Sequence, residues 1–345
     1  MMKRKLKNIL IRILQRLGIY VTLYSSAQRV YYSLHLKPFL IQEYELNKVM
    51  EAAVIANNHK FFNTILLKFL PNWNLKIINA KFFNSGLGAS SLFAFREIKL
   101  EEKTLHEKIY FSSHTDIKRI LWFYEEANLL LKNAGISLPP IYKIYAGDAL
   151  TVVYSEFLDL EKIEASQQEQ TLILFTQKLY QLSQKEEFQI ISENAPKDIK
   201  NFKIHFEYER NRSRAEAVLK EQTISLDNIE RSISQSSTIL AHGDIQETNA
   251  FQNNVLIDWD SVGIFPAGFD PAFLLLYIVL RNKEKDFDVF NWITTNYNKT
   301  IDPKEWKAFE FNVVFFLFVF NQKWISHAMY ADLNNTLIQY IKKHV

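Results

Sequence analysis

The chain has 345 residues, of which 48% are hydrophobic and 23% are charged, and its formal net charge is +3. This length and composition are typical of a folded protein with substantial cores and exclude an intrinsically disordered chain. Cysteine is absent, which excludes disulfides and thiolate metal sites, and no apolar run reaches the roughly 18–20 residues of a membrane span.

Residues 1–42 carry eight basic side chains and no acidic one. An apolar stripe at helical spacing runs through residues 3–17: Leu6, Leu10, Ile13, Leu14 and Leu17. A basic amphipathic helix of this kind fits an anionic membrane surface. It fits equally well an extension that packs on the rest of the protein, and both alternatives stay open. We expect a cytoplasmic protein, at the inner face of the membrane under the first alternative, and no nucleic-acid partner.

Residues 75–83 predict a strand, and an apolar run from Leu92 to Phe95 follows the next loop. That loop contains Gly86 and Gly88, where backbone N–H groups could approach phosphate oxygens. A lone Gly-x-Gly suits an ordinary hairpin turn about as well. Residues 105–111 predict a third strand, on which Lys108 is either a phosphate-contacting side chain or an ordinary exposed lysine.

A helix is predicted from Thr115 or Asp116 to Lys132, and it carries Glu125 and Glu126. Residues 135–140, which begin with Gly and end with two Pro, end this helix. Residues 151–154 then read as a strand. The region from about 160 to 235 is mostly helical by pattern.

Four charged residues of that helical region are possible contacts for a substrate: Glu207, Glu209, Arg210 and Arg212. A solvated helix face is the more common reading of such a charge cluster.

Residues 242–260 are the most informative segment of the chain, because polar residues recur around a short predicted hairpin. Asn253-Asn254 suits a two-residue turn, which would place Asn249 directly opposite Asp258. A carboxamide and a carboxylate paired in this way can share a hard cation such as Mg²⁺. Asp244, on the loop that enters the hairpin, could accept the proton of an attacking hydroxyl. A plain surface hairpin would explain one of these residues but not the joint pattern.

The segment resembles two motifs of the aminoglycoside phosphotransferase and choline kinase family, small-molecule kinases with a protein-kinase-like fold. His242-Gly243-Asp244 with Asn249 matches the family's His-Gly-Asp-x-x-x-x-Asn loop, and Ile257-Asp258-Trp259 matches its Ile-Asp-Trp segment. The resemblance covers roughly residues 75–335. It implies an α+β bilobal fold with a small β-rich N-lobe at 43–154 and a larger helical C-lobe at 155–345, preceded by the 1–42 extension.

The same resemblance implies ATP and Mg²⁺ as cofactors and assigns roles to matched positions. Asp244 would be the catalytic base, and Asn249 and Asp258 would be the magnesium ligands. Lys108 would contact the phosphates, oriented by Glu126 with Glu125 as the runner-up. Gly86 and Gly88 would cover the phosphates.

Two further segments match the family's pattern. Residues 155–158 match its hinge, where main-chain groups of Glu156 and Phe157 would bind adenine. Asp270 matches an aspartate that buttresses the catalytic loop; an N-cap before Pro271 is its other possible role, and both can hold together.

We therefore expect an ATP-dependent phosphotransferase that acts on a hydroxyl of a small molecule. A sugar or surface-glycan intermediate is weakly favoured, with the basic N-terminal segment as the only motive. An amino-alcohol or aminoglycoside kinase and a pseudokinase that scaffolds a membrane-associated assembly are the alternatives. Where the family often has His-Pro-Gly after its Asp, this chain has residues 245–248, and Glu247 adds a negative charge that leaves the acceptor class open.

Overall fold

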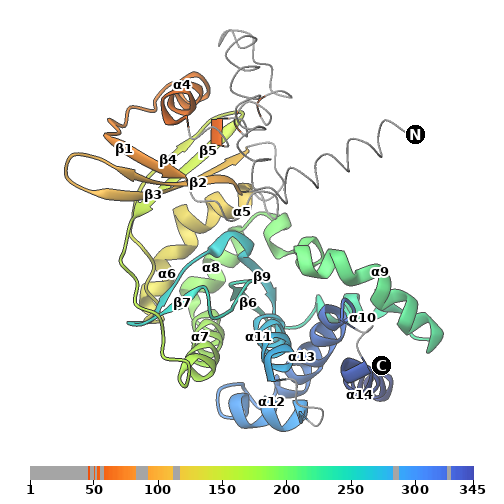
Figure 1. Ribbon diagram of the computed structural model, residues 1–345. Helices are drawn as coiled ribbons and strands as arrows, with labels where there is room; N and C mark the ends of the chain where they lie inside the picture. Colours follow the sequence, from red (N-terminus) through yellow and green to blue (C-terminus); the bar gives the residue numbers. More distant parts are fainter. Residues whose placement is uncertain are drawn as a thin grey trace, which may run out of the picture. The chain divides into compact units, whose positions relative to one another are not determined.

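The computed structural model describes residues 46, 50, 53–54, 58–82, 92–111, 117–282, 287–324 and 328–345 (Figure 1). The chain divides into two compact units, one running to Ile117 and including Pro140–Phe157, the other comprising Lys118–Pro139 and Leu158–Val345. The helix predicted at 3–17, with its membrane contact, and the glycines Gly86 and Gly88 lie outside the described residues.

The first unit is built on a five-stranded antiparallel sheet with the strand order β1-β2-β3-β5-β4. The strands are β1 (Asn79–Phe82), β2 (Leu92–Lys99), β3 (Thr104–Phe111), β4 (Ile141–Ala146) and β5 (Leu150–Glu156). The strands predicted at 75–83, 105–111 and 151–154 are therefore present, with shifted ends. β3 largely alternates buried and more exposed side chains, as a strand with one buried face should, whereas the first five residues of β5 are all buried.

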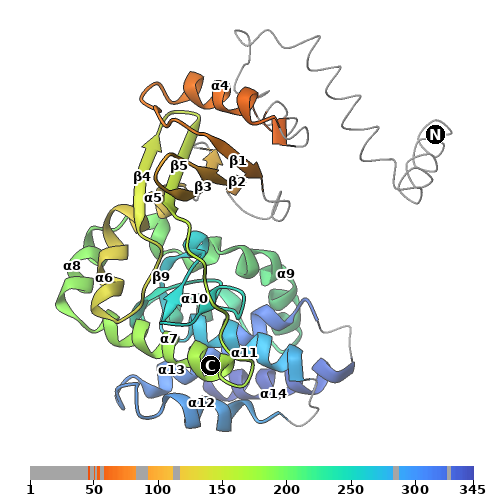
Figure 2. The ribbon, with the colours of Figure 1, turned by 60° about the vertical axis from the view of Figure 1, so that its left-hand side comes forward.

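Helix α4 (His59–Phe69) lies along one face of this sheet (Figure 2). Its buried side chains Phe62, Ile65 and Leu66 join a core with sheet residues that include Leu105 and Ile109. Burying such apolar side chains stabilises the unit by about 1.5–3 kcal/mol each.

A buried polar network fastens α4 to the same face of the sheet. The Arg96 guanidinium makes a two-pronged contact with Glu107 at 2.5 and 2.9 Å, and both side chains are fully buried. Arg96 also donates to Asn63 of α4, while the Tyr154 hydroxyl donates to Glu107. A buried Arg–Glu pair survives desolvation only when its remaining donors and acceptors are satisfied in this way.

The second unit is mainly helical, as predicted for the region after residue 160. A helical stretch of α5 (Ile117–Trp122), the π-helical η1 (Phe123–Ala127) and α6 (Asn128–Asn133) opens it and ends at Gly135, whose φ is +63°. The remaining helices are α7 (Gln168–Ser183), α8 (Glu186–Asn194), η2 (Lys197–Lys200), η3 (Phe202–Ile204), α9 (Phe206–Glu221), α10 (Leu226–Ile233), η4 (Trp259–Ser261), α11 (Phe269–Asn282), α12 (Val289–Tyr297), α13 (Trp306–Asn321) and α14 (Ala328–His344).

The core of the second unit forms around α13, which packs against α11, α9 and α14. All eight residues from Val313 to Phe320 are fully buried, so the intensely apolar run is a core helix, as the sequence indicates. Among the described residues, no helix combines the length and the apolar character that crossing a bilayer requires.

Two short antiparallel pairs lie beside these helices: β6 (Thr238–Ala241) pairs with β9 (Gly263–Pro266), and β7 (Ala250–Phe251) with β8 (Val255–Leu256). Between them the chain forms a loop at residues 242–249 and a turn at 257–262. The polar residues singled out in the sequence therefore all lie on connections between buried strands. The predicted α+β class, with a smaller β-rich part and a larger helical part, is confirmed.

Candidate active site

The hairpin that carries Asn249 and Asp258 is present, but its register differs from the predicted one. Ala250 pairs with Leu256 and Phe251 with Val255, so the loop has three residues and Asn249 lies opposite Ile257. The Ile257 N–H donates to the Asn249 carbonyl at 2.8 Å. The expected direct pairing of Asn249 with Asp258 is wrong, because Gln252 belongs to the loop and shifts the ladder by one residue.

Asp258, just after this hairpin, has a left-handed backbone conformation. Asp258 has φ +65° and ψ +56°, a conformation that non-glycine residues seldom adopt and that ends the strand alternation. Its carboxylate therefore does not follow the pleat of β8. It lies close enough to Asp244 to raise the pKa of that carboxyl group.

Asp270 holds the loop that carries Asp244. One carboxylate oxygen accepts the His242 N–H at 2.7 Å, and the other accepts the Gly243 N–H at 2.9 Å. The predicted buttress is confirmed, and the alternative N-cap role is wrong. Helix α11 already begins at Phe269, so Asp270 lies inside its first turn and directs its side chain to the loop.

Gly243 fits where no other residue would. Its φ is +80°, and a Cβ atom there would lie 2.1 Å from the Ser261 carbonyl oxygen. The close approach of the loop to residues 259–261 thus depends on a missing side chain.

Two buried neutral histidines orient the same loop. The Asp244 N–H donates to His242 Nδ1 at 3.2 Å, so the proton of His242 is on Nε2, which donates to the Ile257 carbonyl at 2.8 Å. His205 Nε2 donates to the Gly243 carbonyl at 2.7 Å. Burial lowers the pKa of His205 to about 3, and the nearby Arg119 adds to this effect.

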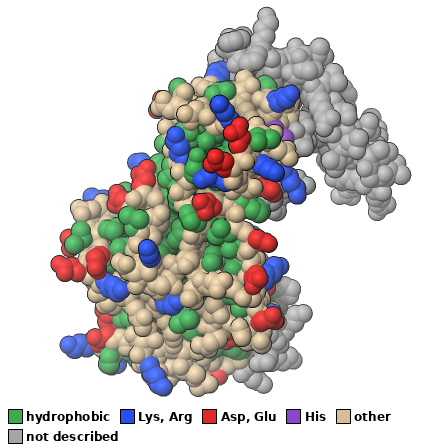
Figure 3. Space-filling model, turned by 90° about the vertical axis from the view of Figure 1, so that its left-hand side faces the viewer, with side chains coloured by type: hydrophobic (Ala, Val, Ile, Leu, Met, Phe, Trp, Pro, Cys, Tyr) green, Lys and Arg blue, Asp and Glu red, His purple; other side chains and the backbone are tan. Residues whose placement is uncertain are grey.

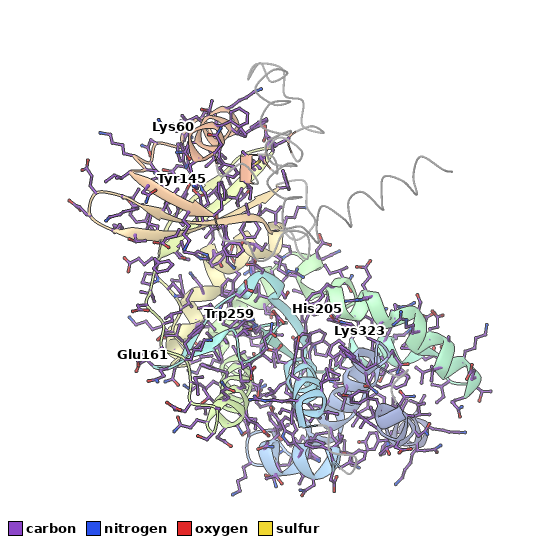
Figure 4. The ribbon with its side chains drawn as sticks, viewed as in Figure 1. Lys60, Tyr145, Glu161, His205, Trp259 and Lys323 are labelled. Atoms are coloured by element: carbon purple, nitrogen blue, oxygen red, sulfur yellow. The ribbon has the colours of Figure 1, made fainter. Side chains whose placement is uncertain are left out.

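His205 lies immediately before α9, in the interior of the second unit with Trp259 (Figure 4). It was not predicted from the sequence. A lone histidine with no motif around it gives no signal that would have found it.

Asp244 is half-buried and receives two side-chain hydrogen bonds on the same oxygen. Gln246 Nε2 donates to Oδ2 at 2.9 Å, and Asn249 Nδ2 donates to Oδ2 at 3.2 Å. Among the described residues, Oδ1 therefore has the greater capacity left to accept a proton. Burial raises the pKa of Asp244 to about 6, with further contributions from the charges of Asp258 and Glu207. A carboxylate with such a pKa suits general-base work near neutral pH.

The residues present fit a magnesium ion. Asn249 is almost fully buried, and its side-chain nitrogen donates to the Asp244 main-chain carbonyl at 2.9 Å and to Asp244 Oδ2. Its side-chain oxygen, which accepts a long hydrogen bond of 3.5 Å from the Thr248 hydroxyl, is the end that could bind a cation, next to two carboxylates that repel each other. Over the described residues, no three His, Cys, Asp or Glu side chains gather as a metal site, so the carboxamide oxygen would be needed as a ligand.

Lys108 lies in the middle of β3, opposite Phe95 of β2 and Val153 of β5. Leu105 and Ile109 point into the core under α4, so by alternation Lys108 lies on the other face of the sheet. This is the face on which a phosphate-contacting lysine could work. Its role stays a prediction.

Glu126 and its runner-up Glu125 are both exposed and lie in the π-helical turn η1. Their helical stretch is fixed within the second unit, because Phe123 stacks on Trp259 with ring centroids 4.7 Å apart. Lys108 belongs to the first unit and Glu126 to the second, so the expected ion pair stays a prediction.

Glu156 and Phe157, expected at the adenine hinge, already donate both their N–H groups within the first unit. The Glu156 N–H binds the Pro140 carbonyl at 2.9 Å, and the Phe157 N–H binds the Thr104 carbonyl at 3.1 Å. Adenine contacts at this segment would therefore need a carbonyl of these residues or a main-chain group further along. The assignment stays a prediction.

The charged residues of α9 separate into two groups. Arg212 forms ion pairs with Glu230, Asp227 and Glu216, so it serves the helical scaffold. Glu207 is mostly buried and contributes to raising the pKa of both Asp244 and Tyr277. The charge of Glu207 therefore acts on the site, while Glu209 and Arg210 are exposed and Arg210 lies 3.8 Å from Glu207.

No family model and no curated protein matches the chain. Solved structures with a similar fold include a microcompartment-associated aminopropanol kinase, which is 15% identical in sequence. The match covers 81% of this chain and 94% of that kinase, with a TM-score of 0.48. A choline kinase from Streptococcus pneumoniae matches at 15% identity, and the match covers 83% of this chain and 99% of that kinase with a TM-score of 0.39. A spectinomycin phosphotransferase matches at 13% identity, 81% and 93% coverage and a TM-score of 0.39.

The choline kinase and the spectinomycin phosphotransferase carry names of the family that the motifs of residues 242–259 resemble. At identities of 13–15%, the likeness concerns the fold alone.

Proposed function

We propose that this protein is a magnesium- and ATP-dependent phosphotransferase that moves the γ-phosphoryl group of ATP to a hydroxyl of a small molecule. One observation carries the proposal: the Asn249 amide donates a hydrogen bond to Asp244, and the Asp258 charge contributes, after burial, to raising the pKa of Asp244. The loop that carries Asp244 is held by two hydrogen bonds to Asp270. A base beside a pair of oxygen ligands is the equipment that phosphoryl transfer to an alcohol requires.

Each of these residues has a separate task in the proposed reaction. Asp244 accepts a hydrogen bond from the acceptor hydroxyl and takes its proton as the oxygen bonds to the γ-phosphorus, while the bond from that phosphorus to the β–γ bridging oxygen breaks and ADP leaves with the electron pair. Asn249 and Asp258 would hold Mg²⁺, which neutralises charge on the phosphates and fixes their position. Asp270 and His205 keep the loop rigid, so that positioning contributes to the rate.

Lys108 and Glu126 extend the proposal to the nucleotide. Lys108 would contact the phosphates from its sheet face, and Glu126 would orient it. Gly86 and Gly88 would cover the phosphates, and main-chain groups around Glu156 and Phe157 would bind adenine.

The acceptor is proposed to be a sugar or glycan intermediate.

On the face shown in Figure 3, Lys and Arg side chains are interspersed with Asp and Glu over the coloured residues, without a large area of one sign. Such a surface gives no support to a nucleic-acid partner.

A melting assay followed by a turnover screen tests the activity. We expect ATP to raise the melting temperature of the full chain when Mg²⁺ is present and much less when EDTA removes it, because ligand binding to the native state stabilises it. Release of ADP that depends on an added alcohol is then expected in the screen. Magnesium-dependent ATP binding without turnover on any alcohol would instead favour a pseudokinase scaffold.

A further inference from the structure

The helical stretch that opens the second unit holds the turn that follows Asp258. Arg119 of α5 is 7% exposed, and its Nη2 donates to the Asp260 carbonyl at 3.3 Å. Phe123, four residues further on and so on the same face of the helix, stacks on Trp259 with ring planes 14° from parallel. The π-helical turn η1 begins at Phe123, and single turns of this kind are frequent at functional sites. The stretch therefore contacts both residues that come directly after Asp258.

Contacts from other parts of the chain hold the same turn. Trp259 also lies against His242, with ring centroids 4.6 Å apart, and its indole N–H donates to the Leu256 carbonyl at 2.9 Å. A left-handed conformation costs a non-glycine residue free energy, and it persists only where the surrounding structure imposes it. The contacts of the turn are therefore what keeps Asp258 left-handed.

Arg119 is buried although an apolar side chain would fill the same space. A guanidinium loses its hydration on burial, which is unfavourable unless hydrogen bonds and charge interactions offset the loss. An apolar side chain could not donate to the Asp260 carbonyl. The Arg119 charge also acts within the unit, since it adds to burial in lowering the pKa of His205. The choice of arginine at this position thus points to a task beyond filling space.

We infer that Arg119 is a positioning residue for the proposed magnesium ligand Asp258. By holding the carbonyl two residues further on, it fixes the left-handed turn from which the Asp258 carboxylate reaches a cation. Phe123 supports the same turn through Trp259. The inference rests on the proposed phosphotransferase activity and adds residues that no motif of the sequence marks.

ATP affinity of the full chain with Mg²⁺ and with EDTA tests the role. Arg119→Met keeps an unbranched side chain and removes the charge and the donors. We expect ATP affinity with Mg²⁺ to fall by about tenfold to a hundredfold, the usual effect of losing a residue that orients a metal ligand. ATP affinity in EDTA should stay the same, so the ratio of the two affinities falls. An unchanged ratio would overturn the inference, because a purely structural role would lower the melting temperature alone.

A double-mutant cycle shows whether Arg119 acts through Asp258. Asp258→Gly removes the carboxylate and adopts the left-handed conformation without strain. In this background Arg119→Met should lower the affinity ratio by less than about twofold further, since the ligand that it positions is already gone. The same fold loss in both backgrounds would show that Arg119 acts on something else.

Arg119→Lys keeps a charge and donors but not the fixed fork of the guanidinium. It should lower the affinity ratio by about two- to fivefold, and this loss should likewise disappear in Asp258→Gly. Where Arg119→Met does not fold, this variant decides. An unchanged ratio in Arg119→Lys, or a loss that persists in Asp258→Gly, then rejects the inference.

Arg212→Met is the matched control. Arg212 pairs with the buried Glu230 between α9 and α10, so its loss should lower the melting temperature and leave the affinity ratio unchanged. An equal fall of the ratio in this variant would remove the special role of Arg119. If the wild-type chain bound ATP no better with Mg²⁺ than with EDTA, the magnesium-dependent activity itself would fail. A wild-type ratio that Asp258→Gly lowers and Arg119→Met does not would leave that activity standing and reject only the role of Arg119.

Discussion

Gly243 sets the geometry of the catalytic loop through the side chain it lacks. Gly243→Ala combines a left-handed backbone with a Cβ placed 2.1 Å from a main-chain oxygen. We expect a loss of about 2–4 kcal/mol in the free energy of unfolding, since both backbone strain and overlap must be relieved. Thermal melting measures the loss, and phosphoryl transfer should fall with it because Asp244 is the next residue.

Gly135→Ala is the matched control. Gly135 also has a positive φ, +63°, but an added methyl group would find its nearest neighbour 3.7 Å away, at the end of a flexible lysine. Only the conformational cost remains there, about 1–2 kcal/mol. Equal effects of the two substitutions would contradict the account of Gly243.

Asp270 should leave a signature in the pH dependence of stability. Burial raises the pKa of its carboxyl group to about 7, well above the ordinary value of 3.8. Between these two values the folded protein holds a proton that the unfolded chain has lost. The contribution of Asp270 to stability therefore falls as pH rises from about 4 to about 7, by at most about 1.4 kcal/mol per pH unit.

Asp270→Asn isolates this effect. The variant loses one acceptor for a buried N–H and should be less stable than the wild-type chain by about 1–3 kcal/mol at about pH 5, and this difference should shrink or reverse by about pH 8. Its free energy of unfolding, measured with urea at about pH 5 and about pH 8, should change less between the two than that of the wild-type chain. Identical changes in the two proteins would show that the Asp270 pKa is not raised.

At this scale the sequence identified the residues that have a motif around them. Asp270 was predictable as a buttress through the family resemblance, because residues 268–272 match the segment in which the family carries such an aspartate. His205 was not, since its contact with the Gly243 carbonyl links positions 38 residues apart and depends on tertiary packing alone.

The hairpin β7–β8 is the element on which the two proposed magnesium ligands depend. Its turn places Asn253 and Asn254 in left-handed conformations, with φ of +59° and +57°. Asn253→Val/Asn254→Val should destabilise the turn by about 1–2 kcal/mol per position, because a β-branched side chain crowds the backbone there. The expected result is a smaller rise in melting temperature on adding Mg-ATP.

Asn253→Gly/Asn254→Gly is the control for this prediction, since glycine adopts the same conformation without strain. It should retain nearly the whole effect of Mg-ATP. If the valine variant also retained it, the hairpin would not be what holds the ligands in place.

The length of the hairpin loop could not be predicted from the sequence. Two consecutive asparagines correctly predicted a left-handed turn, but they did not reveal whether the loop has two or three residues. The unit's own contacts decide this, through main-chain bonds such as that from the Ser137 N–H to the Asn254 carbonyl. The left-handed Asp258 then brings its carboxylate close enough to Asp244 to contribute, after burial, to raising the pKa of that carboxyl group.

At the scale of the whole molecule, hydrophobic patterning predicted individual strands and helices, while the division into a β-rich and a helical part was implied by the family resemblance. Strands of the first unit and the apolar helices α11 and α13 could be predicted because period and length together distinguish them. The Arg96–Glu107 network could not be, because both residues read as surface charges until α4 covers them. The division between an N-lobe at 43–154 and a C-lobe from 155 stays a prediction.

We propose that one loop brings together a base, Asp244, and two ligands of a magnesium ion, Asn249 and Asp258, and that base and ligands have separate tasks. The direct test measures Mg-ATP affinity and phosphoryl transfer on the same preparations of the wild-type chain, Asp244→Asn and Asp258→Asn. Asp244→Asn should bind Mg-ATP nearly normally and lose transfer by about 10²–10⁴-fold, the usual contribution of a general base. Asp258→Asn should weaken Mg-ATP binding itself by about tenfold or more, since a charged ligand of the ion is gone. Near-normal transfer in Asp244→Asn, or undiminished Mg-ATP affinity in Asp258→Asn, would contradict the account.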